Sequence, residues 1–243
     1  MSDAAYGGAT AGMADPTGRP ENIRPELLIA VAGTGTEVGK TWMTVRLVEE
    51  LRARSVTVAA RKPAQSFDEG DTETDASLLA AATGVDPLTV CPAHRWYPIA
   101  MAPPMAADLL DREPIFIRDL VHEIDVSWHD PMLASGHAQV GLVELAGGPW
   151  SPMAHDGDGL DLVALVGVDL VVLVADAGLG TINSVRPAVE ALEERAPVLV
   201  VLNRYDDTVE LHRRNRVWMA DHHGFDIVVS PQALAERIVV QLG

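Results

Sequence analysis

A glycine-rich turn between an apolar run and an amphipathic segment most strongly limits how this chain can fold. The turn reads GTGTEVGKT from Gly33 to Thr41. Backbone N–H groups of such a turn at a helix N-terminus bind phosphate oxygens, a lysine neutralises the β- and γ-phosphates, and the following hydroxyl can ligate Mg²⁺. Lys40 and Thr41 occupy those two positions. A chance Gly-Lys-Thr in an ordinary turn is the alternative, but a strand predicted before it and a helix predicted after it favour a site for ATP and Mg²⁺.

The rest of the chain alternates apolar runs, typical of strands buried on both faces, with amphipathic segments typical of helices. This alternation predicts an α/β fold of the P-loop NTPase type, in which a doubly wound, mostly parallel sheet has helices on both faces. The predicted strands are 27–32, 56–62, 139–144, 170–175, 198–203 and 226–229. The predicted helices are 41–54, 75–83, 117–128, 182–194, 217–222 and 233–242.

The length of 243 residues suits one large domain, or a domain with an appendage. Residues 1–25 are rich in Gly, Ala and Pro and have neither a basic start nor an apolar core, so we expect a disordered leader rather than a signal peptide. Residues 26–243 are then expected to form a single P-loop ATP-binding α/β domain, because no linker or repeat divides them. Within it we expect a loop over 98–104, whose Met and Pro content suits a contact surface.

Charge, hydropathy and cysteine content exclude several classes of partner. The formal net charge is -17, whereas nucleic acids and anionic membranes are bound by clustered Lys and Arg. The longest apolar stretch, 162–175, is interrupted by Asp169 and is too short to span a bilayer. Cys91 is the only cysteine, so no intramolecular disulfide can form, and the cytoplasm is the expected compartment. No base motif accompanies Cys91, and we expect a buried or half-buried thiol there.

Six motifs, the glycine-rich turn included, occur in an order typical of one enzyme family. Five residues separate Gly33 from Gly39, where the general phosphate-loop pattern has four. With this spacing the turn resembles the G-T-x-T-x-V-G-K-T signature of dethiobiotin synthetases. The other five motifs are KPAQS from Lys62, TDA from Thr74, ELAGG from Glu144, GLGTIN from Gly178, and Asn203-Arg204. They resemble the family's K-P-x-x-S, T/S-D-A-x-x-L, E-G-A-G-G and L-G-x-I-N segments and its adenine-contacting Asn, so the resemblance extends from about residue 27 to residue 203.

The resemblance implies an ATP-dependent cyclo-ligase of biotin biosynthesis. Such an enzyme closes a cyclic urea from 7,8-diaminopelargonate, CO₂ (or bicarbonate) and ATP. One amine becomes a carbamate, ATP phosphorylates the carbamate oxygen, and the second amine displaces phosphate. The resemblance also implies a homodimer with its sites near the interface, to which residues 98–105 are candidate contributors.

The matching motifs also imply roles for individual residues. Two anions, the carbamate and the triphosphate, must be held together, which requires cations between them. The implied catalytic residues are Lys62, Lys40 and Thr36. Mg²⁺ takes oxygen ligands and few carboxylates; its implied ligands are Thr41, Asp75 and Glu144. The implied substrate contacts are Thr36, Lys62, Ser66, Gly147 and Gly148. The implied nucleotide contacts are Glu37, Val38, Gly39, Lys40, Thr41, Trp42, Asp75, Glu144, Ala146, Gly147, Asn203 and Arg204.

Four of these residues also have a plainer interpretation. Lys62 could be a surface lysine at a strand end, although ligands of open α/β sheets bind outside the carboxyl ends of strands. Asp75 could cap a helix, as could Thr74 before it. Asn203 could simply end a strand. Glu144 ends an apolar strand, where an unpaired carboxylate would be costly to bury, and this favours a ligand role.

Three positions depart from the commonest family pattern, because Gly35, Leu145 and Phe67 stand where Asp, Gly and Gly are frequent. A bulky Leu145 or Phe67 could reshape the substrate pocket, which leaves altered specificity or lost activity open.

Three other functions remain as alternatives. A P-loop amidoligase would carry a glutaminase domain with a nucleophilic Cys, for which this chain has no room. A partitioning-type ATPase, which binds DNA or membrane, typically starts K-G-G-x-x-K and ends in a basic or amphipathic tail. Here position 34 is Thr, and the segment after Ala233 has Arg237 as its one cation. An inactive interaction protein is supported by Leu145 alone.

Overall fold

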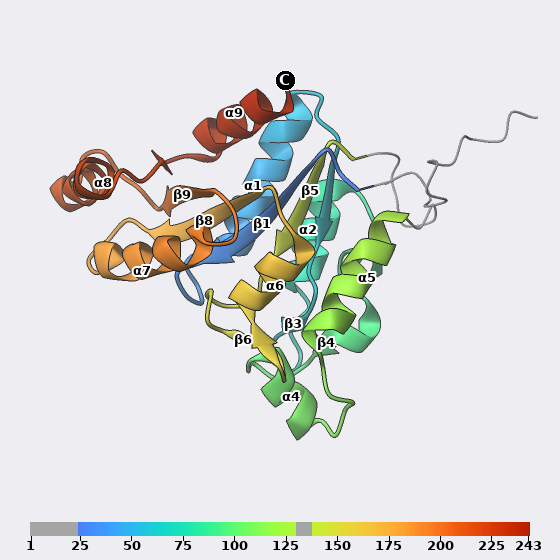
Figure 1. Cartoon of the computed structure of the whole chain (residues 1–243). Coiled ribbons are helices and arrows are strands. Elements are labelled where there is room, and N and C mark those ends of the chain that lie inside the picture. Colours follow the sequence, from blue (N-terminus) through green and yellow to red (C-terminus); the bar gives the residue numbers. More distant parts are fainter. Residues whose placement is uncertain (1–23, 130–137) are drawn as a thin grey trace, which may run out of the picture.

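The computed structural model describes residues 24–129 and 138–243, and these form a parallel six-stranded sheet with helices on both faces (Figure 1). The strand order is β10-β9-β8-β1-β5-β2, and every neighbouring pair is parallel. The strands are β1 (Leu27–Gly33), β2 (Val58–Arg61), β5 (Val140–Glu144), β8 (Leu170–Asp176), β9 (Val198–Asn203) and β10 (Ile227–Val228). The predicted doubly wound α/β fold is confirmed.

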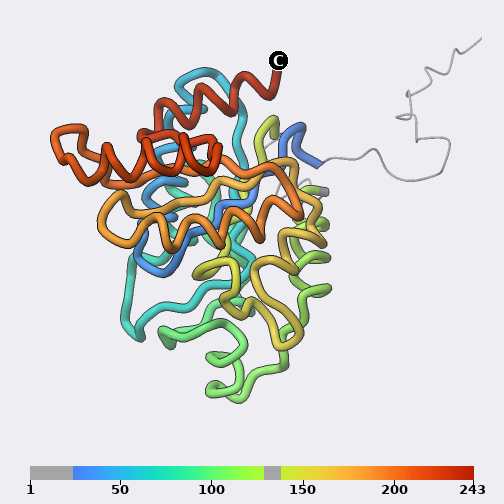
Figure 2. Tube along the Cα trace, turned by 60° about the vertical axis from the view of Figure 1, so that its left-hand side comes forward, coloured from blue at the N-terminus to red at the C-terminus, as the bar shows by residue number. Residues whose placement is uncertain are grey.

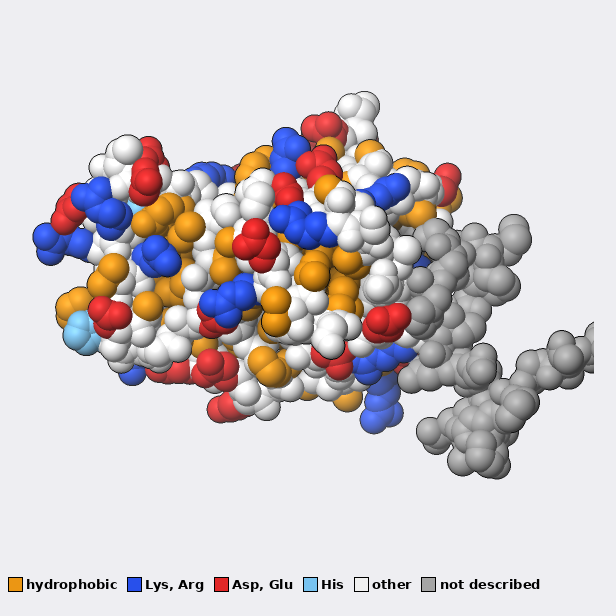
Figure 3. All heavy atoms as spheres, turned by 90° about the horizontal axis from the view of Figure 1, so that it is seen from above, with side chains coloured by type: hydrophobic (Ala, Val, Ile, Leu, Met, Phe, Trp, Pro, Cys, Tyr) orange, Lys and Arg blue, Asp and Glu red, His pale blue; other side chains and the backbone are white. Residues whose placement is uncertain are grey.

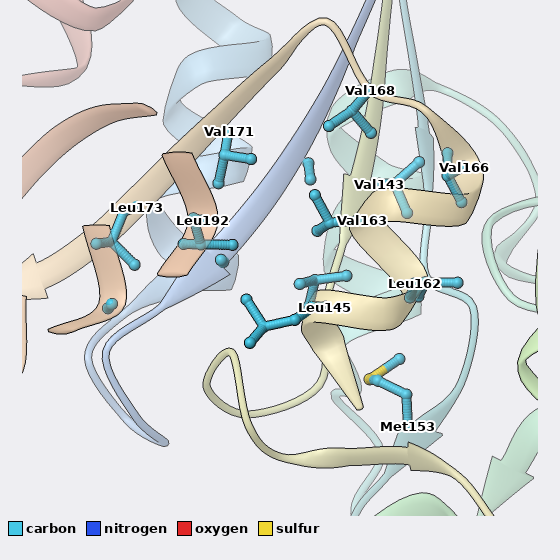
Figure 4. Packing of buried hydrophobic residues seen from close by; sticks show 14 of the residues in the cluster. Val143, Leu145, Met153, Leu162, Val163, Val166, Val168, Val171, Leu173 and Leu192 are labelled. Carbon is cyan, nitrogen blue, oxygen red and sulfur yellow. The ribbon is translucent and has the colours of Figure 1, made fainter. Parts of the chain in front are cut away.

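The apolar strands are buried because helices cover the sheet from both sides. On one face, Leu47 of α1 (Lys40–Ala53), Leu79 of α2 (Asp75–Thr83) and Leu234 of α9 (Pro231–Leu242) belong to one buried cluster. The other face carries α5 (Ile117–His129), α6 (Gly159–Val166), α7 (Thr181–Glu193) and α8 (Glu210–His223). Figure 4 shows part of that second cluster, in which Val163 and Leu192 pack against the sheet. Alternate residues of β1 and β8 enter opposite clusters, as period-two strands require.

The path of the chain places a ligand-binding point beside β1. The chain leaves β1 through α1 to β2, which lies beyond β5 on one side, and it returns from β5 through α6 to β8 on the other side. Ligands of open α/β sheets bind outside the carboxyl ends of the strands at such a switch point. Gly33, Glu144 and Asp176 end these three strands.

Short elements gather at one end of the molecule, opposite the C-terminus in Figures 1 and 2. Two of them, β3 and β4, are a small parallel pair, and β6 and β7 are an antiparallel pair. The elements are β3 (Gln65–Ser66), α3 (Pro87–Val90), a 3₁₀ turn (Ala93–Arg95), β4 (Trp96–Tyr97), α4 (Pro103–Leu109), β6 (Pro152–Ala154) and β7 (Gly157–Asp158).

Four helices differ from the sequence expectation: the short α3 was not predicted, and α4, α6 and α8 differ as follows. The predicted loop 98–104 ends at Ala102, because Pro103 and Pro104 fill the first turn of α4, where their missing N–H groups cost nothing. Helix α8 begins at 210 instead of 217, since its first turns are polar and lack apolar periodicity. Glu210 supports them through ion pairs with Arg213 and Arg214. Helix α6 was missed within an apolar stretch that Gly167, at φ 65°, divides into helix and strand.

Other expectations concern the chain start, the surface and Cys91. Of the predicted leader 1–25, residues 1–23 lie outside the described residues, whereas Arg24 donates to Gly167 O at 2.6 Å. Within the described ranges, no helix combines the length and apolar character needed to cross a membrane. On the face in Figure 3, Lys and Arg side chains are interspersed with Asp and Glu.

Cys91 is buried, and burial raises its pKa to about 12, as suits an unreactive thiol.

Candidate active site

The glycine-rich turn connects β1 to α1, and its backbone lies close to the side chain of Lys40. Lys40 begins α1, and its Nζ donates to Gly35 O at 3.0 Å. A Cβ at Gly33 would lie 2.9 Å from Lys40 Cδ, so this position needs a residue without a side chain. Gly39 takes φ 89°, in the left-handed region that favours glycine. The loop therefore has the geometry of a phosphate cradle at a helix N-terminus.

Gly39 also makes a close approach that no other residue would permit. A Cβ at that position would lie 2.2 Å from Asn203 Nδ2. The same Asn203 Nδ2 donates to Val38 O at 3.0 Å, so the last residue of β9 is hydrogen-bonded to the loop. Asn203 thus does more than end a strand.

Gly39→Ala and Gly35→Ala form a matched pair that tests this strain. We expect Gly39→Ala to lower the free energy of unfolding by at least about 1 kcal/mol, because alanine at positive φ is strained and its Cβ would displace Asn203. Gly35→Ala should change it by less than about 0.5 kcal/mol, because a Cβ at position 35 would have no other atom within 4 Å. Urea denaturation of the two variants makes the comparison, and equal losses would contradict the strain argument.

Glu144 is the centre of a buried polar network at the end of β5. It has 0% exposure, and its Oε1 accepts from Lys62 Nζ at 2.8 Å. Thr44 of α1 donates to Glu144 Oε2 at 2.7 Å. Thr41 Oγ1 lies 2.8 Å from Glu144 Oε1 and 2.7 Å from Asp75 Oδ1. The three predicted metal ligands, Thr41, Asp75 and Glu144, are therefore adjacent.

Lys62 lies between the two carboxylates and is not a surface lysine. Its side chain is 2% exposed, and Nζ is 2.7 Å from Asp75 Oδ2 and 2.8 Å from Glu144 Oε1. Burial by itself lowers the pKa of Lys62, but Glu144 and Asp75 outweigh it and raise that pKa above its ordinary value. Burial raises the pKa of Asp75, and the Lys62 ammonium and Thr41 hydroxyl outweigh it and hold that pKa below its ordinary value. Lys62 is thus a charged ammonium held beside the phosphate loop.

Asp75 is not the cap of its helix. Thr74 is the N-cap of α2: its side chain accepts from Ser77 N at 3.3 Å, and its own N–H donates to Ser77 Oγ at 2.8 Å. Asp75 is the first helical residue, and its carboxylate reaches Thr41 and Lys62 instead. Thr74 therefore caps the helix, and Asp75 makes the contacts with Thr41 and Lys62.

Lys40 lies beside the same network, and its pKa is lower than that of an ordinary lysine. Burial, and then the nearby Lys62 ammonium, lower the pKa of Lys40 to about 8, although Glu144 and Asp75 partly oppose them. Two ammonium groups, Lys40 and Lys62, thus approach one region of the site. Such a region is suited to an anion that carries more than one charge.

A cavity of about 710 Å³ lies over this network, and most of the predicted site residues line it. Its volume is typical of a small-molecule site. The predicted residues in its lining are Thr36, Glu37, Gly39, Lys40, Thr41, Trp42, Lys62, Ser66, Asp75, Ala146 and Gly147.

The remaining predicted residues lie outside the lining and contact the glycine-rich turn or the polar network. Glu144 is bonded to Thr41 and Lys62. Gly148 lies against the loop, where its Cβ would be 3.4 Å from Gly33 O. Val38 offers its carbonyl to Asn203. Arg204 donates to Glu37 O at 2.9 Å and pairs with Asp176 at 2.9 Å, so it links the ends of β8 and β9 to the loop.

Several lining residues were not predicted from the sequence. Gln65 is buried, its Oε1 accepts from Ala76 N at 2.9 Å, and its Nε2 has no partner among the described residues. Ser66 Oγ, a predicted substrate contact, is likewise buried without a described partner. Both donors therefore remain for a ligand or for rearrangement. Gln65 precedes Ser66 in KPAQS, a signal that could have identified it. The other unpredicted lining residues are Ala100, Met101, Ala102, Pro103, Ser151 and Pro152.

Two of the departures from the family pattern face away from the cavity. Leu145 is 1% exposed and lies among core residues such as Val143 and Met153 in Figure 4. The Phe67 ring packs edge-on against Trp96, with centroids 6.1 Å apart. Neither belongs to the lining formed by the described residues. The space for a ligand is therefore not reduced by these two side chains.

Comparison with known proteins finds sequence matches over most of the chain. Residues 28–235 match the family described as AAA domain. The ATP-dependent dethiobiotin synthetase BioD of Anaeromyxobacter sp. (strain Fw109-5) is 40% identical over 184 residues, which are 73% of this chain and 77% of that protein. The protein of the same name from Caulobacter vibrioides (strain NA1000 / CB15N) is 32% identical over 207 residues, which are 84% of this chain and 91% of that protein.

Solved structures agree on the fold. A plasmid partition protein from Borrelia burgdorferi superposes with a TM-score of 0.53 over 90% of this chain and 99% of that one, at 10% sequence identity. Identity that low supports the fold alone and does not favour the partitioning function. The sequence relatives, by contrast, are 40% and 32% identical over most of both chains. The chain therefore belongs to the family of the ATP-dependent dethiobiotin synthetases, within the AAA domain proteins.

Proposed function

We propose that the protein is a dethiobiotin synthetase that uses Mg²⁺ and ATP to close a cyclic urea from 7,8-diaminopelargonate and CO₂ or bicarbonate. One observation carries the proposal: the buried Lys62 ammonium lies beside the phosphate loop, at the floor of a cavity of about 710 Å³. Lys62 and Lys40 line the same cavity, so two ammonium groups are available for an anionic acceptor held beside the triphosphate. The named relatives point to the same chemistry.

The residues present fit a magnesium ion. Thr41 Oγ1 approaches carboxylate oxygens of both Asp75 and Glu144, yet a hydroxyl has one proton and can donate to one of them at a time. Oxygen atoms gathered in this way are the donors that Mg²⁺ prefers, with phosphates and water completing its shell. Within the described residues, no group of three or more His, Cys, Asp or Glu is arranged to hold a metal unaided. Mg²⁺ bound by Thr41, Asp75 and Glu144 would supply charge stabilisation to the phosphates.

The proposed reaction assigns each step to a part of the cavity. An amine of the substrate adds to CO₂ and loses a proton to give a carbamate. The carbamate oxygen then attacks the γ-phosphorus, and ADP departs. Lys40 and Lys62 would neutralise the charge shared between carbamate and triphosphate, with Thr36 and Ser66 donating hydrogen bonds to the carbamate. The second amine finally attacks the carbonyl carbon and loses a proton, phosphate leaves, and the ring closes.

We further propose a homodimer in the cytoplasm. Met101 and Met105 near the cavity mouth are 42% and 56% exposed, and exposed apolar side chains of this size suit a protein interface. Residues 98–105 would then contribute to the neighbouring site. Nucleic acid and membrane are not proposed as partners, given the net charge of -17.

Phosphate release tests the proposed reaction. The protein is incubated with ATP, Mg²⁺, bicarbonate and 7,8-diaminopelargonate, and phosphate is measured with and without the diamine. We expect release that requires the diamine and bicarbonate and yields one dethiobiotin per phosphate. Release that ignores the diamine would instead support a partitioning-type ATPase. Absence of ATP binding would support an inactive interaction protein, and diamine-dependent release without dethiobiotin would indicate an amidoligase with another substrate.

A further inference from the structure

A second cavity, of about 270 Å³, lies between α3, the turn that follows it and α5, and it shares only Lys62 with the cavity described above. Its lining is largely apolar. The apolar members are Pro63, Leu88, Val90, Pro92, Ile124 and Val126. None of these residues is used by the proposed reaction.

Arg61, the last residue of β2, is the distinctive member of this lining. It is 5% exposed, and its guanidinium stacks over the Trp128 ring at 4.4 Å. It donates to Ser127 Oγ at 2.8 Å, to Ser127 O at 3.1 Å and to Ala60 O at 2.8 Å. All three acceptors are neutral, and a guanidinium has five N–H donors, so two remain. Burial lowers the pKa of Arg61 to about 10, consistent with a desolvated cation.

No carboxylate of a described residue forms an ion pair with Arg61. The one carboxylate in the lining, Glu123, is already held by Arg95 at 2.7 and 3.0 Å and by His94 at 3.0 Å. Lys62, the other cation of the lining, is balanced by Asp75 and Glu144 on its far side. A buried cation without a counter-ion is costly, and the cost falls when an anion binds.

We propose that this second cavity binds a small monocarboxylate with a short apolar body. The carboxylate pairs with the free N–H groups of Arg61, and the apolar body lies along the aliphatic lining. Fork-shaped pairing of guanidinium with carboxylate gives charge and direction together. The volume admits on the order of nine non-hydrogen atoms, taking about 30 Å³ for each. Six-carbon acids therefore fit, whereas a nucleotide does not.

The site is also placed to communicate with the first cavity. Lys62 N donates to Val90 O at 2.8 Å, so α3 is bonded to the residue that carries the proposed catalytic ammonium. The inference does not depend on the proposed reaction, because its test measures binding and no turnover.

The test compares hexanoate with its neutral isostere hexanamide. The full chain is first saturated with Mg²⁺·ADP, which occupies the phosphate loop and its lysines, and each probe is then titrated while backbone amide shifts are followed by NMR. We expect saturable shifts at cavity residues such as Thr89 and Val126, and hexanoate binding at least ten-fold tighter than hexanamide. Shifts elsewhere, equal affinities or no saturable shift would overturn the proposal.

Two pairs of variants make the test specific. Arg61→Gln should abolish the preference for hexanoate while hexanamide still binds. Arg112→Gln is its matched control, because Arg112 also donates to a backbone carbonyl and stacks over a ring but lies outside the cavity lining. Preference retained in Arg61→Gln would contradict the role of the guanidinium.

A cavity-filling variant keeps the proposal testable if Arg61→Gln fails to fold. Val126 is 48% exposed, so Val126→Trp can fill the cavity from its rim with Arg61 intact. It should weaken both probes at least ten-fold, whereas Val240→Trp on α9 should not. Unchanged binding in Val126→Trp would place the probes elsewhere and overturn the assignment.

Discussion

Replacing Lys62 with alanine is expected to lower diamine-dependent turnover by about 10³-fold or more, while Mg²⁺·ATP binding largely survives. In the proposed reaction, Lys62 and Lys40 together neutralise the charge shared between carbamate and triphosphate, and the lining formed by the described residues holds no third Lys or Arg to replace Lys62. Nucleotide binding should survive because the glycine-rich turn and Lys40 remain. The side-chain oxygens of Thr41, Asp75 and Glu144 also remain, and oxygen atoms are the ligands that Mg²⁺ prefers.

Stability must be separated from catalysis in this experiment. Removing Lys62 leaves Glu144 buried beside Asp75 without its cation, which is expected to cost about 3–5 kcal/mol. Turnover and ADP affinity are therefore measured at low temperature on protein shown to be folded by circular dichroism. Lys62→Met, which keeps the aliphatic volume, should lose turnover equally. Turnover retained in either variant would remove Lys62 from the site.

Replacing Lys40 with alanine is expected to weaken ADP and ATP binding by about 10- to 150-fold, whereas Lys62→Ala should leave nucleotide binding largely intact. Lys40 is enclosed by the glycine-rich turn, and its Nζ now donates to a neutral carbonyl, Gly35 O. A bound phosphate would replace that carbonyl with an anion, and a charge-assisted hydrogen bond is worth about 1.5–3 kcal/mol, or roughly 10- to 150-fold. Diamine-dependent turnover should fall with the affinity.

Calorimetric titration with Mg²⁺·ADP measures this effect. Arg52→Ala is the matched control, because Arg52 lies on the same helix, is exposed, and donates to Ala82 O away from the cavity lining. It should leave the affinity within about two-fold. Unchanged ADP affinity in Lys40→Ala would mean that the turn from Gly33 to Thr41 does not hold the phosphates.

The sequence identifies Lys40 and Lys62 as candidate cations, but it does not show what surrounds them. Both stand in recognisable motifs, GTGTEVGKT and KPAQS, so their identity as candidate cations required no structure. Lys62 nevertheless had a plain alternative as a surface residue. Its 2% exposure and its contacts with Asp75 and Glu144 remove that alternative. Sequence separation hid these contacts, because the three residues meet only where strand ends converge.

The helices that were missed or shortened either lacked apolar periodicity, resembled a loop, or lay within a continuous apolar stretch, as α6 does. The first turns of α8 are stabilised by ion pairs around Glu210, and α4 begins with two prolines that resemble a loop signal. Leu145 was interpreted as a possible obstruction from its position beside Glu144. Successive side chains at the end of β5 alternate between the two faces of the sheet, and Leu145 therefore lies in the core instead.

The sequence by itself determined the fold class, the phosphate loop and the family, because each depends on local pattern: period-two strands, period-3.6 helices, and glycines where the backbone must turn tightly. Tertiary structure decided which charged groups pair with one another and which polar groups face a ligand. Lys62 between two carboxylates, Gln65 beside the first turn of α2, and Arg61 without a described counter-ion all depend on packing across strands and helices. Electrostatic balance is a property of distances in space, and the order of residues along a chain does not contain those distances directly.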